Sequence, residues 1–236
     1  MQLRFRRGFH SLRNEKQDTE KGRRKPSWNV FSVPSAYLDT SVLGHWILYH
    51  SQSRNMTELP PSARSSLELL RLVRNGRLDC KLETTDFALT ELSQVVRDNL
   101  LASKMMRDAQ SLVYFQSLKS YYKLDDDEQE DFITYFREFN ILLRELKIVG
   151  KRMKIMETRT SATAIVLGVD VPDGLHLNWA NRQRCKYFVT TDSRLLELIR
   201  DENPFMGKMW VINPGQLPQV LSAEKEKNKK TKTKRK

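Results

Sequence analysis

The chain has 236 residues, of which 39% are hydrophobic and 30% are charged, and its net charge is +12. This length suits one domain with additions, or two small domains. No apolar run reaches the roughly 18 to 20 residues that a membrane-crossing helix needs, so we expect no transmembrane segment. The two cysteines, Cys80 and Cys185, have neither zinc-site nor disulfide-framework spacing, which indicates buried free thiols in a reducing compartment.

The positive charge lies at the two ends of the sequence. Residues 1–26 contain nine Lys and Arg against three Asp and Glu, and residues 223–236 contain eight against two. The residues between them are therefore neutral overall. We expect a basic disordered arm over 1–30 and a basic disordered tail over 223–236, which would attach to a polyanion, nucleic acid before a membrane surface. Solvated ends without a partner are the alternative.

The N-terminal arm leaves two locations open. Its first fourteen residues, "MQLRFRRGFHSLRN", contain no acid, and Met1, Phe5, Phe9 and Leu12 fall on one helical face. A mitochondrial presequence has this pattern, and so does a plain basic arm. We predict a cytoplasmic protein, with a mitochondrial location as the alternative.

The body of the chain, residues 31–222, alternates between strand and helix patterns. An apolar run at 35–39 predicts a strand, and helices follow at 42–50 and at about 62–75, the second closed by Gly76. The other expected elements are strands over 77–84, 186–192 and 208–214 and helices over 85–100 and 193–201. This alternation predicts an α/β fold, with a mainly parallel sheet covered by helices.

The middle of the chain differs, because the pattern from about 104 to 157 is wholly helical. Apolar residues there are spaced alternately three and four apart, which is typical of a heptad seam. The seam consists of Phe132, Tyr135, Phe139, Leu142, Leu146, Val149, Met153 and Met156. The preceding "MMRDAQSLVYFQSLKSYY" would supply an antiparallel partner, and the acids of "LDDDEQED" suit the start of the second helix. We predict a helical hairpin inserted at about 104–157, buried within itself, in a homodimer or against a protein partner. The alternative is that both helices pack flat on the sheet.

Four carboxylates fall where function gathers in a parallel sheet, beyond the carboxyl ends of the strands. Asp39 and Asp192 each follow a strand and precede a helix, Glu91 lies one turn into a helix, and Asp173 opens "VPDGLHLNWA". Any one of them taken alone is more often a helix cap or a surface charge, and for Asp39 the simplest explanation is a cap. If they converge, however, they would repel one another unless a cation were present, and oxygen ligands favour Mg²⁺ or Mn²⁺. Such an ion would hold a phosphodiester and activate water.

Four segments in order resemble the acidic motifs of the PIN-domain nucleases: "AYLDTSVL", "TTDFALTELSQ", "VPDGLHLNWA" and "YFVTTDSRLL". The closing "MWVINPGQL" resembles the last strand of that family, and the match covers roughly 35–102 and 158–220. The resemblance implies a three-layer α/β/α sandwich and metal-dependent cleavage of RNA, often by toxins that have a cognate antitoxin. It also implies a quartet of catalytic metal ligands, Asp39, Glu91, Asp173 and Asp192, with Ser41 and Thr190 as supporting hydroxyls.

The sequence also departs from the family pattern. The chain is longer than many members, the helical insertion separates the second acid from the third, and the basic ends are unusual for a toxin. Gly174 stands where Ala is usual, and "LHLNW" alternates more like a strand than a helix.

Three nearby residues have plainer interpretations. We interpret His176 as a surface or packed histidine and Asp86 as a helix N-cap. Asp170 is the nearest rival of Asp173.

Two hypotheses follow. The first is an endoribonuclease that uses Mg²⁺ or Mn²⁺ bound by Asp39, Asp173 and Asp192, with Glu91 as a further ligand or as the residue that positions water. The second is a non-catalytic PIN-fold module that binds RNA or a ribonucleoprotein.

Overall fold

A parallel β-sheet organises the part of the chain that the computed structural model describes, namely residues 33–49, 53–153, 168–199 and 208–233. Its strands are β1 (Ser35–Leu38), β2 (Lys81–Thr85), β3 (Val149–Lys151), β4 (Tyr187–Val189) and β5 (Trp210–Ile212). They are ordered β3-β2-β1-β4-β5, and all neighbours pair in parallel. The predicted parallel sheet is confirmed. The predicted arm over 1–30 lies outside the described residues.

The order of the strands defines where a site is expected. The chain adds β2 and β3 on one side of β1, and then crosses to the other side to add β4 and β5. β1 and β4 are paired with Tyr37 opposite Phe188 and Leu38 opposite Val189. Their carboxyl ends therefore meet at the point where the winding reverses, and in such sheets this point is the usual place for a ligand.

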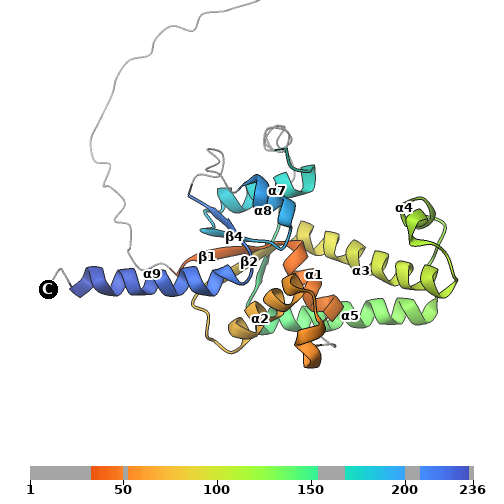
Figure 1. Cartoon of the computed structure of the whole chain (residues 1–236), viewed down its shortest axis with the longest axis horizontal. Coiled ribbons are helices and arrows are strands. Elements are labelled where there is room, and N and C mark those ends of the chain that lie inside the picture. Colours follow the sequence, from red (N-terminus) through yellow and green to blue (C-terminus); the bar gives the residue numbers. More distant parts are fainter. Residues whose placement is uncertain (1–32, 50–52, 154–167, 200–207, 234–236) are drawn as a thin grey trace, which may run out of the picture. The chain divides into compact units, whose positions relative to one another are not determined.

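Helices cover both faces of the sheet, which confirms the α/β/α sandwich (Figure 1). On one face pack α1 (Thr40–Tyr49), α2 (Pro61–Arg74), α3 (Asp86–Arg107), α5 (Asp126–Glu145) and α9 (Gln216–Thr233). The other face is covered by α7 (Val171–Arg182) and α8 (Ser193–Leu198). The short elements are η1 (Ser53–Glu58), η2 (Leu112–Tyr114) and α4 (Phe115–Leu118). The segment "LHLNW" is thus part of helix α7, and its strand-like alternation was misleading.

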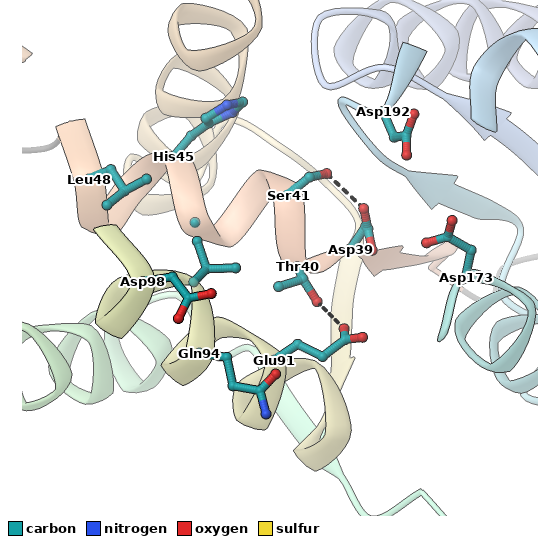
Figure 2. Close-up of a pocket in the computed structure, with 12 residues that line it drawn as sticks. Asp39, Thr40, Ser41, His45, Leu48, Glu91, Gln94, Asp98, Asp173 and Asp192 are labelled. Carbon is teal, nitrogen blue, oxygen red and sulfur yellow. Dashed lines mark hydrogen bonds between the residues drawn. The ribbon is translucent and has the colours of Figure 1, made fainter. Parts of the chain in front are cut away.

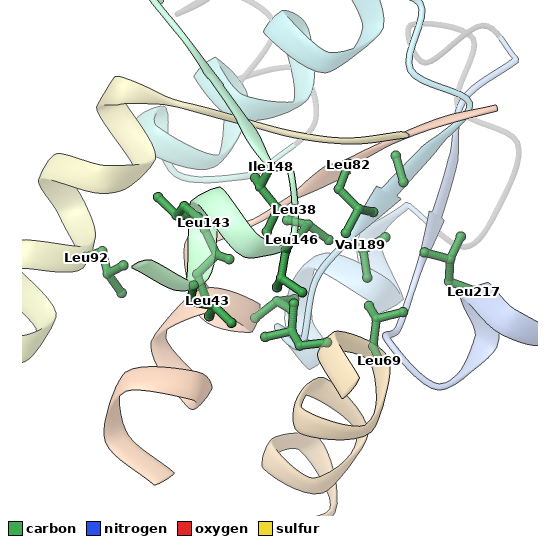
Figure 3. Close-up of a cluster of buried hydrophobic side chains, with 14 of the residues drawn as sticks. Leu38, Leu43, Leu69, Leu82, Leu92, Leu143, Leu146, Ile148, Val189 and Leu217 are labelled. Atoms are coloured by element: carbon green, nitrogen blue, oxygen red, sulfur yellow. The ribbon is translucent and has the colours of Figure 1, made fainter. Parts of the chain in front are cut away.

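Alternation along the strands produces the two cores. Leu38 and Val189 point into the larger core, whereas Tyr37 and Phe188, their chain neighbours, point into the smaller one. In the larger core the strand side chains meet leucines from several helices (Figure 3). Each fully buried leucine contributes roughly 2 kcal/mol, so this layer fixes the helices that carry the site residues.

A helical hairpin is present, but its arms are not the predicted ones. α3 continues to Arg107, well beyond the predicted end at residue 100, and lies beside α5 (Figure 1). The segment 105–122 was expected to supply one arm, but its first three residues end α3 and the others lie in the connection that contains η2 and α4. The second arm is α5, and it begins at the acidic segment, as predicted. Asp125 and Glu128 form a capping box there.

The predicted heptad seam does not continue beyond Leu146, so this part of the prediction is wrong. Helix α5 ends there because Lys147 adopts a left-handed φ of 52° and Ile148 N–H returns to the carbonyl of Leu143. Val149 then begins β3, Met153 is buried in the smaller core, and Met156 lies outside the described residues. Before that point the seam residues Phe139, Leu142 and Leu146 are buried in the main core. The last part of α5, from Phe139 onwards, therefore packs on the sheet, as the alternative interpretation predicted.

The C-terminal segment is helical through Thr233, so the expected disordered tail is wrong for residues 223–233. α9 is held by Leu217 and Leu221, which are buried in the main core. Among the described helices none is long and apolar enough to cross a membrane.

Candidate active site

A cavity of about 500 Å³ opens at the carboxyl ends of β1 and β4. Five carboxylates line it (Figure 2). One of them, Asp98 on α3, is paired with Arg97 and Lys119, and the other four come from four separate parts of the fold. Asp39 follows β1, Glu91 lies on α3, Asp173 lies in the first turn of α7, and Asp192 follows β4. The fold thus brings together all four residues that the sequence singled out, although Glu91 and Asp173 are far apart along the chain. The cavity then continues between α1 and α3, past Leu48 and Val95.

Asp39 is held by two hydroxyl groups. Its Oδ2 accepts hydrogen bonds from Ser41 Oγ at 2.7 Å and from Thr190 Oγ1 at 2.8 Å, and the residue is only 7% exposed. Within the described residues, Oδ1 has no hydrogen-bond partner, and the Asp39 side chain accepts no backbone N–H. Capping is therefore not what this carboxylate does in the structure. One oxygen is fixed and the other is left for the cavity.

The same hydroxyls connect the end of β1 to the end of β4. Ser41 Oγ accepts from Thr191 N–H at 3.1 Å, and Thr190 Oγ1 accepts from Asp192 N–H at 3.1 Å. The two oxygens lie 3.2 Å apart. Since Thr190 is fully buried, its bond to Asp39 is shielded from water. Ser41 and Thr190 therefore fix the orientation of Asp39.

Asp192 is both a cavity residue and a helix cap. Its Oδ1 accepts from Leu195 N–H at 3.1 Å and so satisfies one free donor of the first turn of α8. Asp170, in contrast, does not line the cavity. Its side chain is 74% exposed, near Arg194, and it forms no capping bond at the start of α7. The choice of Asp173 over Asp170 agrees with this geometry.

Asp173 shows the electrostatic consequence of the arrangement. Burial, and next the charges of Asp39 and Asp192, raise the pKa of the Asp173 carboxyl to about 6. Among the described residues that line the cavity there is no Lys or Arg. The acids are thus gathered without a fixed positive charge to balance them.

Two side chains form hydrogen bonds with the Glu91 carboxylate. Its Oε2 accepts from Thr40 Oγ1 at 2.8 Å and lies 2.6 Å from His176 Nε2. His176 is 1% exposed, and its Nδ1 lies 2.5 Å from the hydroxyl of Tyr37. The histidine is packed, as predicted, but it also joins the core to a site carboxylate. Burial raises the pKa of Tyr37 far above its usual value, so this hydroxyl keeps its proton.

Sequence reasoning missed the role of this pair. The only signal for His176 was its position three residues after Asp173, which places both on adjacent turns of one helix. Tyr37 gave no signal, because a buried aromatic residue in a strand is usually a core residue. Asp86, expected to cap α3, is instead the first residue of the helix, and the cap is Thr85, whose Oγ1 accepts from Ala88 N–H.

The donor set suits a hard divalent cation, but the acids are not drawn together as ligands. Carboxylate and hydroxyl oxygens are the donors that Mg²⁺ and Mn²⁺ prefer. The raised pKa of the Asp173 carboxyl means that burial and the neighbouring negative charges disfavour its ionised form, and a positive charge in the cavity would offset this repulsion. In the described ranges, however, no group of three or more His, Cys, Asp or Glu side chains is arranged so that it could hold a metal ion.

Comparison with models of known protein families and with curated proteins gives no match for this sequence. The fold and the site therefore carry the functional inference.

Proposed function

We propose that this protein is a metal-dependent endoribonuclease with a PIN-like fold. The observation that supports the proposal most is the lining of the cavity: besides Asp98, which is paired with Arg97 and Lys119, four carboxylates from four parts of the fold line it at the switch point of a parallel sheet. No described Lys or Arg lines that cavity. Structural carboxylates are normally paired, so an unbalanced group is the arrangement expected of a cation site.

Each side chain has a distinct role in this proposal. Asp39, Asp173 and Asp192 would hold Mg²⁺ or Mn²⁺, and Glu91 would add a ligand or position the attacking water. Ser41 and Thr190 hold Asp39, so that its free oxygen stays directed at the cavity. The bound ion would supply the positive charge that stabilises the phosphodiester transition state and lowers the pKa of water. The cavity volume of about 500 Å³ lies in the range of ordinary small-molecule sites and accommodates a short piece of RNA chain.

The choice of RNA depends on the motif resemblance and on the basic ends. A net charge of +12 concentrated outside the neutral body would attract a phosphate backbone. An antitoxin partner, a homodimer through the helices of 104–157, and a cytoplasmic or mitochondrial location stay predictions from the sequence.

A second function is favoured by one specific observation. Because no group of acids in the described residues is arranged to hold a metal ion, a PIN-like module that binds RNA without cutting it is the competing proposal. The two proposals differ in the expected effect of a divalent cation, which would allow the nuclease to cleave RNA but would not make the binding module cleave it.

Incubation of purified protein with single-stranded RNA, in EDTA and then with excess Mg²⁺ or Mn²⁺, separates the two proposals. The nuclease cleaves only when the ion is in excess. Unchanged cleavage in EDTA would contradict the metal mechanism. RNA binding without cleavage under every condition would favour the binding module.

A further inference from the structure

A buried chain of hydrogen bonds leads from the sheet to Glu91. It starts at the first turn of α3, where Thr85 Oγ1 accepts from Ala88 N–H at 3.2 Å. Thr85 Oγ1 lies 3.1 Å from the Tyr37 hydroxyl, which is 2.5 Å from His176 Nδ1. The other imidazole nitrogen, Nε2, is 2.6 Å from Glu91 Oε2. Thr85 and Tyr37 are fully buried.

For a neutral imidazole, the chemistry of these groups sets the direction of each bond. A carboxylate oxygen only accepts, so the proton at the last link is on His176 Nε2. With Nε2 protonated, a neutral imidazole accepts at Nδ1, and the Tyr37 hydroxyl is the donor there. Tyr37 then accepts from the hydroxyl of Thr85, which itself accepts from Ala88 N–H. All donors in the chain therefore point towards Glu91, and bonds aligned in this way strengthen one another.

The imidazole has little freedom to turn. His176 packs against the rings of Tyr37 and Phe87, with centroids 5.7 Å and 5.2 Å away. Its donor and the hydroxyl of Thr40 both bind the same carboxylate oxygen, Oε2. The other oxygen of Glu91 has no hydrogen-bond partner among the described residues, and Glu91 lines the cavity (Figure 2).

We propose that His176, oriented by Tyr37, is a positioning residue that holds Glu91 by one oxygen and presents its other oxygen to the metal and the attacking water. This assignment depends on the proposed nuclease function. It differs from the acidic quartet because neither His176 nor Tyr37 touches the substrate or the ion. Removing an outer partner of a metal-site carboxylate typically lowers affinity or activity by about 10- to 100-fold.

Two pairs of variants test the assignment. Tyr37→Phe removes only the hydroxyl that orients the imidazole. Its matched control is Tyr187→Phe, which makes the same change on the paired strand, since Tyr187 faces the larger core, away from the site. In the second pair, His176→Gln places an amide donor near the former Nε2, towards Glu91. His176→Asn places its amide near the former Nδ1, towards Tyr37, and leaves Glu91 without this donor.

The measurements are the Mn²⁺ dissociation constant by calorimetry, kcat and KM for RNA cleavage, and the melting temperature in EDTA. Tyr37→Phe and His176→Asn should weaken Mn²⁺ binding and lower kcat by about tenfold, with KM for RNA unchanged. Tyr187→Phe should match the wild type, and His176→Gln should restore most of what His176→Asn loses.

Each outcome is decisive. If the wild type cleaves and binds Mn²⁺, but Tyr37→Phe and His176→Asn equal it, the positioning role is wrong and the nuclease proposal stands. Equal losses in His176→Gln and His176→Asn, in step with melting temperature, would show a purely structural role. If the wild type neither binds Mn²⁺ nor cleaves RNA, the proposed function fails and the positioning role fails with it.

Discussion

The molecule contains two groups of acids next to α3. The acids of one group form ion pairs with Lys and Arg, whereas those of the other group face a cavity. At the far end of α3, Lys104 and Arg107 pair with Asp125 and Glu128 at the start of α5. Near its beginning, Glu91 belongs to a cavity whose described lining residues include five carboxylates and no Lys or Arg. Of these five, Asp98 is paired with Arg97 and Lys119, which lie outside the lining, and the four site acids have no such partner among the described residues.

The pKa values record the difference. The hydrogen bond from Lys104, followed by the N-cap bond from Glu128 N–H, lowers the pKa of Asp125. In the cavity, burial and neighbouring carboxylates raise that of Asp173 to about 6. The chain thus supplies its own cations where acids hold a hairpin together. Where it supplies none, the proposed divalent cation would come from solution. This contrast motivates the predictions below.

The largest effect is expected at the unpaired acids. Asp39→Asn or Asp192→Asn should lower cleavage by a factor of roughly a hundred or more, because each removes a group that organises transition-state charge. Folding should survive, since Asn keeps an oxygen that accepts from Leu195 N–H or from the two hydroxyls at Asp39. The measurement is the cleavage rate at fixed Mn²⁺, with folding checked by circular dichroism.

The double variant sharpens this prediction. Residues that act as a unit are not additive, so Asp39→Asn with Asp192→Asn should be little worse than either alone. Wild-type cleavage by either single variant would show that the acids do not share a site.

Glu128→Gln should instead lower the stability of the protein and leave cleavage unchanged. The side chain is 6% exposed and pairs with Lys104 and Arg107, so its loss leaves two cations without their buried partner. We expect the free energy of unfolding to fall by about 1 to 3 kcal/mol, below the full cost of a deeply buried pair because the cations are partly exposed. Urea denaturation measures the loss. Cleavage per folded molecule should stay at the wild-type rate, and a loss of cleavage at full stability would erase the distinction between the two groups.

The raised pKa of Asp173 predicts a dependence on pH in the metal-free protein. Since the folded pKa of about 6 lies above the unfolded value of 3.8, the folded state binds more protons between these values. Stability from this group is therefore present below about pH 4 and is lost as the pH rises towards 6. Asp173→Asn should be more stable than the wild type by about 1 to 2 kcal/mol at pH 7, after allowance for partial exposure. At pH 4 the two should be equal.

Urea denaturation in EDTA at both pH values measures this difference. Other acids titrate in both proteins, so their contributions cancel. A difference that is the same at pH 4 and pH 7 would contradict the shifted titration.

The smallest effect is expected from the C-terminal cations. Removal of residues 229–236 leaves Leu217 and Leu221, which anchor α9, in place. It removes six Lys and Arg residues. RNA affinity at moderate salt should fall by about tenfold or less, and the plot of its logarithm against that of the salt concentration should become shallower. Identical slopes would mean that these residues are solvated and do not contact RNA.

Much of the site could be predicted because it depends on local patterns. Asp39 and Asp192 each stand where an apolar strand stops and a helix starts, and such positions fall on one edge of a parallel sheet. The resemblance of four ordered motifs to the PIN-domain nucleases then implied that Glu91 and Asp173 belong to the same site. Tyr37 and His176 could not be found in this way, because their pairing joins a strand and a helix that are far apart in sequence and is visible only in three dimensions.

The errors in the fold have a physical cause as well. α5 ends just before Lys147, whose left-handed conformation stops the helix with no Gly or Asn to mark the stop, so the heptad spacing suggested that the helix continued. α3 extends to Arg107 because its end is paired with the acids of α5, a contact that helical periodicity does not contain. Residues 223–236 were expected to be disordered from their charge alone, whereas Leu217 and Leu221 anchor a helix that extends to Thr233.

Direct measurement of Mn²⁺ binding by calorimetry, in the full chain without RNA, tests most simply whether the unpaired acids form a cation site. The wild type and Glu128→Gln should bind Mn²⁺ alike, whereas the variant with both Asp39→Asn and Asp192→Asn should show at least a hundredfold weaker binding, or none, because two of the proposed carboxylate ligands are gone. Equal binding by all three proteins, or no binding by the wild type at millimolar Mn²⁺, would contradict a metal site in this cavity.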